Sequence, residues 1–225
     1  MKLKFFATLI SLPALIGLAA AGVFIYKNLA EPEKAKEDTV SEKTPLAIER
    51  PETTVQEEQE IAKETLLNKD GFNIILPAGW QEVSDFPDVL AMAIDSKEKL
   101  KEEKTKNLDF ITNFSIKNDD LSKYTRVFTV EDYGKSIEES LVQLIPGIKF
   151  TPEKLGAING QNAFFVETES TQEEVDFKTL LVFIEGNNNT IWAISFNTFK
   201  DSWLAYKDLF YQIAESFKLK YKLEF

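Results

Sequence analysis

Hydrophobic residues recur with two different periods along most of this chain, and each period predicts one kind of element. Short apolar runs bounded by turn-forming residues are typical of β-strands. Such runs occupy residues 72–76, 89–94, 110–116, 149–158, 162–169, 175–185 and 190–197. In Phe110–Ile116 every second residue is apolar or threonine, so we expect one face of this strand to be buried. Glycine, proline and asparagine predict turns at 77–80, at Gly160 and at 186–189.

Two segments have the helical period instead. From Thr129 to Ile145 apolar residues recur every three or four positions, and Thr129 is the predicted N-cap, with acidic residues in the first turn. This helix should end before Pro146-Gly147. A second amphipathic helix is predicted from about Lys200 to Leu219. Its apolar stripe consists of Trp203, Tyr206, Leu209, Phe210, Ile213, Ala214 and Phe217.

The order of these elements predicts the fold class. Strands joined by short turns are antiparallel, and two amphipathic helices need a sheet on which to bury their apolar stripes. We therefore predict an α+β fold over residues 67–225. An antiparallel β-sheet carries the helices on its faces as an α/β/α sandwich, in the order strands, helix, strands, helix.

A longer apolar run precedes this domain. It extends from Phe5 to Tyr26, behind Lys2 and Lys4, and so has the roughly 20 residues that a helix needs to cross the hydrocarbon of a bilayer. We expect residues 1–28 to form a single transmembrane anchor. The apolar residues of this anchor include Phe5, Leu9, Leu15, Ile16, Val23, Phe24 and Ile25.

The alternative is a cleaved secretory signal, because Ala19 and Ala21 have the spacing of small residues that signal peptidase accepts. The apolar run continues past the cleavage site after Ala21, which favours a retained anchor in the cytoplasmic membrane. The preceding lysines then keep the N-terminus cytoplasmic and put the globular domain outside. If the chain is cleaved after Ala21, the domain is secreted.

Residues 29–66 are rich in Glu, Lys, Thr and Pro and contain few apolar residues. Such a segment buries too little apolar surface to offset the entropy of ordering it, so we interpret it as an acidic, disordered tether. A short helix from Thr54 to Leu67, near its end, is an alternative for that part.

Charge and composition narrow the possible chemistry. The formal net charge is −11, which disfavours binding to nucleic acid. The sequence has no histidine and no cysteine, so we expect no cofactor, no metal centre and no catalysis. Gly134-Lys135-Ser136 lacks the first glycine of a phosphate-binding loop. Ser115 and Ser195 lie in strand patterns, and Asp119-Asp120 lacks the spacing of a strong calcium site.

Four features together resemble one known family. They are the strand and turn of residues 72–80, the central helix, the turn and strand Ile158-Asn159-Gly160-Gln161-Asn162-Ala163, and the close Glu215-Ser216-Phe217. Residues 70–220 resemble the PsbP-like fold family, whose bacterial members include DcrB-like and LpqN-like exported proteins. The resemblance implies a non-enzymatic domain with an α/β/α sandwich fold and no family-wide catalytic residues.

Two functions are consistent with this sequence. The first is a non-enzymatic, membrane-tethered interaction module that docks on a protein complex outside the cytoplasmic membrane. The alternative is a carrier of a lipid or another apolar small molecule, which would require an apolar cavity between the sheet and the last helix. Trp80 and Trp192 are the candidate residues for a partner or ligand surface, because each lies near a turn.

Overall fold

The computed structural model describes residues 63–84, 88–98, 110–122, 124, 127–172 and 174–220. The predicted anchor, with all of its named apolar residues and Ala21, and nearly all of the predicted tether lie outside the described residues. Within the described ranges, neither α-helix has the length and apolar character needed to cross a bilayer.

The described chain contains strands and helices in the predicted order. The strands are β1 (Thr65–Lys69), β2 (Phe72–Leu76), β3 (Trp80–Val83), β4 (Ala91–Asp95), β5 (Asn113–Asp120), β6 (Lys149–Phe150), β7 (Lys154–Ile158), β8 (Gln161–Gln172), β9 (Val175–Glu185), β10 (Thr190–Phe199) and β11 (Lys218–Leu219). The helices are α3 (Val130–Leu144), the 3-10 turn η1 (Lys200–Ser202) and α4 (Trp203–Glu215).

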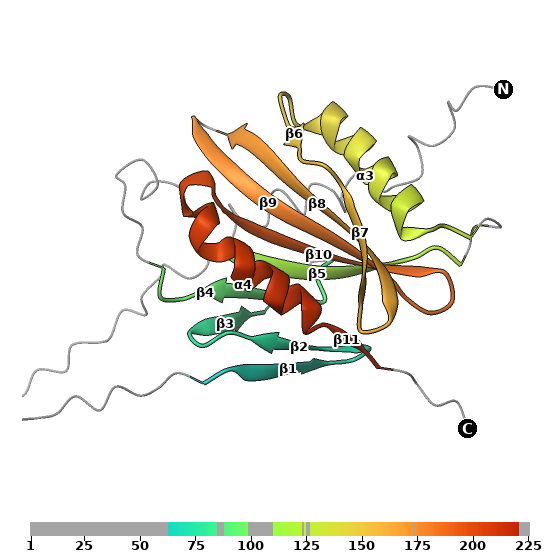
Figure 1. Ribbon diagram of the computed structural model, residues 1–225. Coiled ribbons are helices and arrows are strands. Elements are labelled where there is room, and N and C mark those ends of the chain that lie inside the picture. Colours follow the sequence, from blue (N-terminus) through green and yellow to red (C-terminus); the bar gives the residue numbers. More distant parts are fainter. Residues whose placement is uncertain are drawn as a thin grey trace, which may run out of the picture.

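The strands form two antiparallel sheets (Figure 1). The larger has the order β3-β4-β5-β10-β9-β8-β6, and β7 also pairs with β8. The smaller has the order β1-β2-β11, so that β2 lies between the first described strand and the last. All the strand pairs are antiparallel, as the short connections predict.

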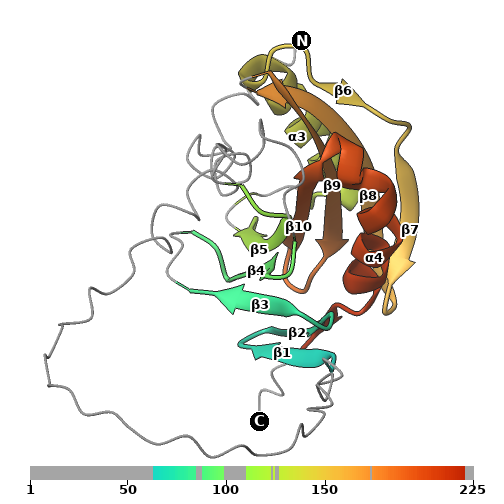
Figure 2. The same cartoon turned by 90° about the vertical axis from the view of Figure 1, so that its left-hand side faces the viewer.

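The two α-helices cover opposite faces of the large sheet (Figure 2). Because side chains alternate between the faces of a strand, Leu181 and Phe183 of β9 pack with α3, whereas Leu180 and Val182 pack with α4. Both faces of the central strands are therefore buried, whereas the sequence pattern of residues 110–116 predicts one buried face. This arrangement confirms the predicted α/β/α sandwich.

Helix α3 begins and ends where the sequence predicts. The hydroxyl of Thr129 accepts a hydrogen bond from the Asp132 N–H at 3.0 Å, so Thr129 is the N-cap. Helix α4 differs from the prediction, because it ends at Glu215 instead of continuing to Leu219. Lys218 and Leu219 leave the helix and pair with β2 as β11, which the sequence pattern did not reveal.

Strands β1 and β3 were also not predicted. Residues Thr65 and Leu66, which the sequence places in the tether, belong to β1 and pair with β2. The predicted helix of residues 54–67 is therefore wrong for Thr65–Leu67, and its remaining residues lie outside the described ranges or have no regular structure. Leu67 is buried in the core below α4. Burial of this side chain favours the strand over the predicted helix for Thr65–Leu67.

Candidate functional site

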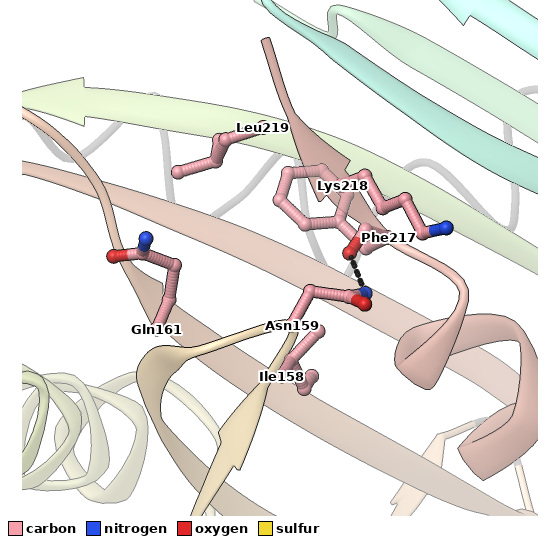
Figure 3. Close-up of a pocket in the computed structure, with 6 residues that line it drawn as sticks. All are labelled: Ile158, Asn159, Gln161, Phe217, Lys218 and Leu219. Carbon is pink, nitrogen blue, oxygen red and sulfur yellow. Dashed lines mark hydrogen bonds between the residues drawn. The ribbon is translucent and has the colours of Figure 1, made fainter. Parts of the chain in front are cut away.

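A pocket of about 180 Å³ opens where the β7–β8 turn meets β11. It is lined by Ile158, Asn159, Gln161, Phe217, Lys218 and Leu219. Figure 3 shows residues of the β7–β8 turn facing the segment that follows α4. Two parts of the chain that are distant in the sequence therefore form this pocket together.

The β7–β8 turn has a shape that its sequence dictates. Ile158 and Gln161 are cross-strand partners, so only Asn159 and Gly160 form the loop. Both have positive φ angles, 48° and 84°, as a type I′ hairpin turn requires. Asparagine and glycine are the residues that adopt this conformation most readily.

The Asn159 side chain then fixes the turn to the end of α4. Its Nδ2 donates hydrogen bonds to the carbonyl oxygens of Glu215, at 2.9 Å, and Phe217, at 2.7 Å. Ser216 makes a second connection, since its hydroxyl accepts from the Ile75 N–H of β2 at 3.0 Å. The end of α4, the hairpin turn and the small sheet are thus held in a fixed arrangement around the pocket.

The floor of the pocket rests on three aromatic rings. Phe217 is 1% exposed, and its ring centroid lies 5.4 Å from that of Phe72 and 5.5 Å from that of Trp192. Trp192 in turn fits closely against Gly71 and Gly186, where an added Cβ would lie about 3 Å from indole atoms. A floor packed in this way gives a pre-formed surface for a bound group.

Among the residues that the structure describes, no strand pairs with the edge of β11 that faces away from β2, and Leu219 of β11 also lines the pocket. Lys218 pairs with Asn73, and the Lys220 N–H donates to the Gly71 carbonyl at 2.8 Å. Because alternate residues of an antiparallel strand hydrogen bond to opposite sides, the N–H and C=O of Leu219 point away from β2. Since β11 is the last strand of the small sheet, this edge can accept another strand.

The pocket offers apolar contact and amide groups that can hydrogen bond. Its lining contains three apolar side chains, two amides and one lysine, with no hydroxyl and no carboxylate side chain. The volume is below the 300–1,000 Å³ typical of small-molecule sites. It can take one side chain of a larger partner.

Of the two tryptophans predicted as a partner or ligand surface, the structure brings only Trp192 close to this pocket. Trp80 lies in β3, where its ring contacts those of Phe114 and Phe210 at centroid distances of 5.7 and 6.4 Å. Both indoles are 7% exposed and belong to the core below α4. Contact of either tryptophan with a ligand or partner stays a prediction.

The interface between α4 and the sheet is filled by aromatic rings. Phe210 is completely buried, and its ring centroid lies 5.1 Å from that of Phe196, 5.6 Å from Tyr206 and 6.0 Å from Trp203. This is the place where a carrier of apolar molecules would need its cavity. The close packing of these rings gives no support to the carrier alternative.

The other residues considered for chemistry take part in internal contacts. Asp119 accepts a hydrogen bond from the Tyr133 hydroxyl, and Asp120 accepts one from the Ser122 N–H. Within the described ranges, no group of three or more acidic side chains is placed to hold a metal ion. Ser115 and Ser195 are cross-strand partners and almost completely buried, so neither hydroxyl is accessible to a substrate.

A group of buried polar side chains on the α3 face of the large sheet was not predicted. Asn197 of β10 is its centre: its Nδ2 donates to Asn113 Oδ1 at 3.2 Å, and its Oδ1 accepts from the Thr179 hydroxyl at 3.0 Å. These three residues lie side by side on neighbouring strands. Their mutual hydrogen bonds satisfy the buried amides and hold the strands in register.

Comparison with known proteins supports the fold and leaves the function open. No family model matches the sequence, and no curated protein matches it. Among solved structures, cyanobacterial PsbP (CyanoP) from Synechocystis sp. PCC 6803 is 20% identical, and the match covers 72% of this chain and 96% of that protein with a TM-score of 0.52.

Two further structures are similar at lower TM-scores. LpqN of Mycobacterium tuberculosis, which is involved in cell envelope biogenesis, is 10% identical with a TM-score of 0.49, over 76% of this chain and 100% of that one. The Saccharomyces cerevisiae Ran-binding protein Mog1p is 14% identical with a TM-score of 0.47, over 70% and 94%. The described domain has the PsbP-like fold that its sequence resembles.

Proposed function

We propose that this domain is a non-enzymatic interaction module that holds an extended segment of a partner protein along the free edge of β11. The observation that carries the proposal is the position of the pocket directly beside the outward N–H and C=O of Leu219. An added strand would hydrogen bond to these two groups and insert one side chain into the pocket. This is the β-augmentation mode of peptide recognition, in which backbone bonds give affinity and pockets give specificity.

The predicted anchor and tether fit this role. The tether joins the domain at β1, in the same three-stranded sheet as β11. A retained anchor would hold the module outside the cytoplasmic membrane, where a partner complex in or near the membrane is within reach of the tether. We therefore extend the proposal to a membrane-tethered, extracytoplasmic module.

Site-specific photocrosslinking in cells tests the binding edge. A photoreactive amino acid replaces Gln161 in the pocket of the full-length chain or, as a control, Leu204, which is 89% exposed on α4. We expect one protein to be crosslinked from position 161 and not from position 204. Leu219→Pro, which removes the outward N–H, should abolish the crosslink, whereas Leu219→Val should retain it. A crosslink that persists in L219P would contradict strand pairing at this edge.

Two further experiments test tethering and the carrier alternative. Deleting residues 1–27 should reduce recovery of the same crosslinked partner, and unchanged recovery would show that tethering is not needed. Native mass spectrometry of the full-length chain, purified gently from membranes in detergent, reports cleavage after Ala21 and bound species together. A co-purifying protein supports the module, and a bound molecule of lipid-like mass would favour the carrier.

A further inference from the structure

Strand β7 forms part of the outer edge of the large sheet. In the part of the chain that the structure describes, only β8 pairs with β7, and Figure 2 shows β7 at the side of the sheet. The backbone groups of such an edge are a template for another strand, and soluble proteins often protect them with charged side chains. In β7, only Lys154 of the five residues is charged. This edge is therefore suited to pairing with another chain.

Leu155 and Ala157 present the outward backbone groups of β7. Ile158 and Gln161 flank the two-residue turn and are cross-strand partners, so they exchange hydrogen bonds within the hairpin. Because alternate residues of an antiparallel strand bond to opposite sides, Gly156 also bonds to β8, whereas the N–H and C=O of Leu155 and Ala157 point away from it. The side chains of both residues are exposed, and that of Leu155 is 57% exposed.

We propose that β7 pairs with β7 of a second copy of this chain, so that two large sheets join into one antiparallel sheet. The two strands lie about a two-fold axis that passes beside Gly156. Leu155 of each copy is then opposite Ala157 of the other copy. Each of these two pairs exchanges both of its backbone hydrogen bonds, so every outward N–H and C=O of the two residues has a partner.

The side chains of β7 suit this register. Leu155 and Ala157 lie on the same face of the strand, so each exposed leucine packs beside the small alanine of the second copy. The two Gly156 residues meet between the hydrogen-bonded pairs, where opposite Cα atoms approach to about 4.5 Å. Lys154 is opposite the apolar Ile158, so the one charge of β7 has no like charge opposite it.

The symmetry of the contact favours a second copy over an unrelated strand. A two-fold interface uses the same patch on both copies, so it closes after two chains and leaves neither β7 edge exposed. The proposed binding edge, on β11, belongs to the small sheet. The inference is therefore independent of the proposed function, and a dimer formed in this way carries two copies of that binding edge.

Crosslinking between introduced thiols tests the register in the membranes of cells that express the full-length chain. The sequence has no cysteine, so each introduced thiol is unique. Two chains with different affinity tags are co-expressed, one with Leu155→Cys and the other with Ala157→Cys, and dibromobimane joins neighbouring thiols. Product that carries both tags is then measured.

We expect this mixed pair to give roughly 5-fold more product than two Leu155→Cys chains or two Ala157→Cys chains. Residues directly opposite each other are about 5.5 Å apart between Cα atoms, whereas diagonal neighbours are about 7–8 Å apart. Leu204→Cys, at a position that is 89% exposed on α4, is paired with Ala157→Cys as the control for random collision. It should give as little product as the other two controls.

A matched pair of variants tests the backbone pairing. Ala157→Pro removes the outward N–H and leaves the bonds to β8 in place, whereas Ala157→Ser keeps the N–H and has a side chain of similar size. Analytical ultracentrifugation of the full-length chain in detergent measures self-association. A dimer of the proline variant lacks two of the four hydrogen bonds, so its dissociation constant should rise roughly 10-fold, with little change in the serine variant.

A second variant keeps the test valid if proline disturbs the hairpin, which circular dichroism would reveal. Leu155→Gln retains all the backbone groups and loses the apolar contact, so it should also weaken the dimer. A chain that is monomeric at every concentration, or equal crosslinking from all the cysteine pairs, would overturn the inference. So would a dimer that is unchanged in folded A157P, strongest crosslinking between two L155C chains, or a photoreactive residue at position 155 that captures another protein and no second copy.

Discussion

Gly134, in the second turn of α3, lies directly against the ring of Phe164 in β8. A Cβ at position 134 would be 2.5 Å from Phe164 Cδ1, closer than van der Waals contact allows. This contact explains why a glycine occupies a buried helical position. It also explains Gly134-Lys135-Ser136 without a phosphate site, since Lys135 is exposed and forms an ion pair with Glu131 one turn earlier.

Gly134→Ala should therefore destabilise the domain. Alanine gains about 1 kcal/mol of helix propensity over glycine, but overpacking against a buried ring costs about 1–3 kcal/mol, so we expect a net loss of up to about 2 kcal/mol in the free energy of unfolding. Urea denaturation measures it. The double variant Gly134→Ala/Phe164→Leu should be less destabilised than the sum of its single variants, and strict additivity would show that the ring is not the cause.

The carboxyl of Glu138 should make the domain less stable as the pH rises from about 5 to 8. Burial raises the pKa of Glu138, in α3, to about 7, and the negative charge of Glu153 adds to the rise while Lys135 opposes it. The folded state thus retains a proton that the unfolded state has released, so stability is lost between the unfolded pKa near 4.5 and the folded pKa near 7.

Glu138→Gln should remove part of this pH dependence. Because the carboxyl is partly solvated, we expect the variant to gain about 1 kcal/mol over the natural chain at pH 8 and little at pH 5. Denaturation curves at both pH values measure the difference, with Glu139→Gln, an exposed neighbour, as the control. An equal effect of E138Q on stability at both pH values would exclude this carboxyl as the source of the pH dependence.

Lys178 should contribute strongly to the attachment of α4. It is 5% exposed, its Nζ lies 3.3 Å from Glu167 Oε2 and 3.2 Å from Glu169 Oε1, and the ring of Trp203 covers it. Lys178→Ala leaves two carboxylates near the sheet without this partner, so we expect a loss of about 2–4 kcal/mol in unfolding free energy. Lys200→Ala removes an exposed partner of Glu169 and should cost less than about 1 kcal/mol.

Asn159 should control the local stability of β11. Asn159→Ala removes both hydrogen bonds to the end of α4 and strains a positive φ, so it should cost about 2–3 kcal/mol, whereas Asn159→Gly loses only the hydrogen bonds and should cost less. Hydrogen exchange at the Lys220 N–H should accelerate in both variants. Asn162→Ala, three residues later on the exposed side of β8, should leave that exchange rate unchanged.

The elements that periodicity predicts are those with a long, regular pattern. Helix α3 agrees with its prediction within one residue at each end, because the stripe, the Thr129 cap and Pro146-Gly147 all indicate the same limits. Strand β11 could not be found in this way. Two residues carry no period, and Phe217 continues the stripe of α4, so only the distant partner Asn73 defines the strand.

The candidate site was predictable only in its parts. Asn159-Gly160 indicates a tight turn, but nothing nearby in the sequence reveals that the amide reaches the end of α4. The place of Trp192 near a turn makes it a candidate from the sequence, whereas its packing against Phe217 depends on the folded chain. The pocket exists because distant segments meet, and a single sequence contains no local signal of that.

The order β1-β2-β11 determines how the domain would bear mechanical force. Strands β1 and β11 run in the same direction on either side of β2. Tension between a membrane anchor before Thr65 and a partner held at Lys220 would pull these strands in opposite directions along their axes. The hydrogen bonds on both sides of β2 would then resist together in shear, rather than open one after another.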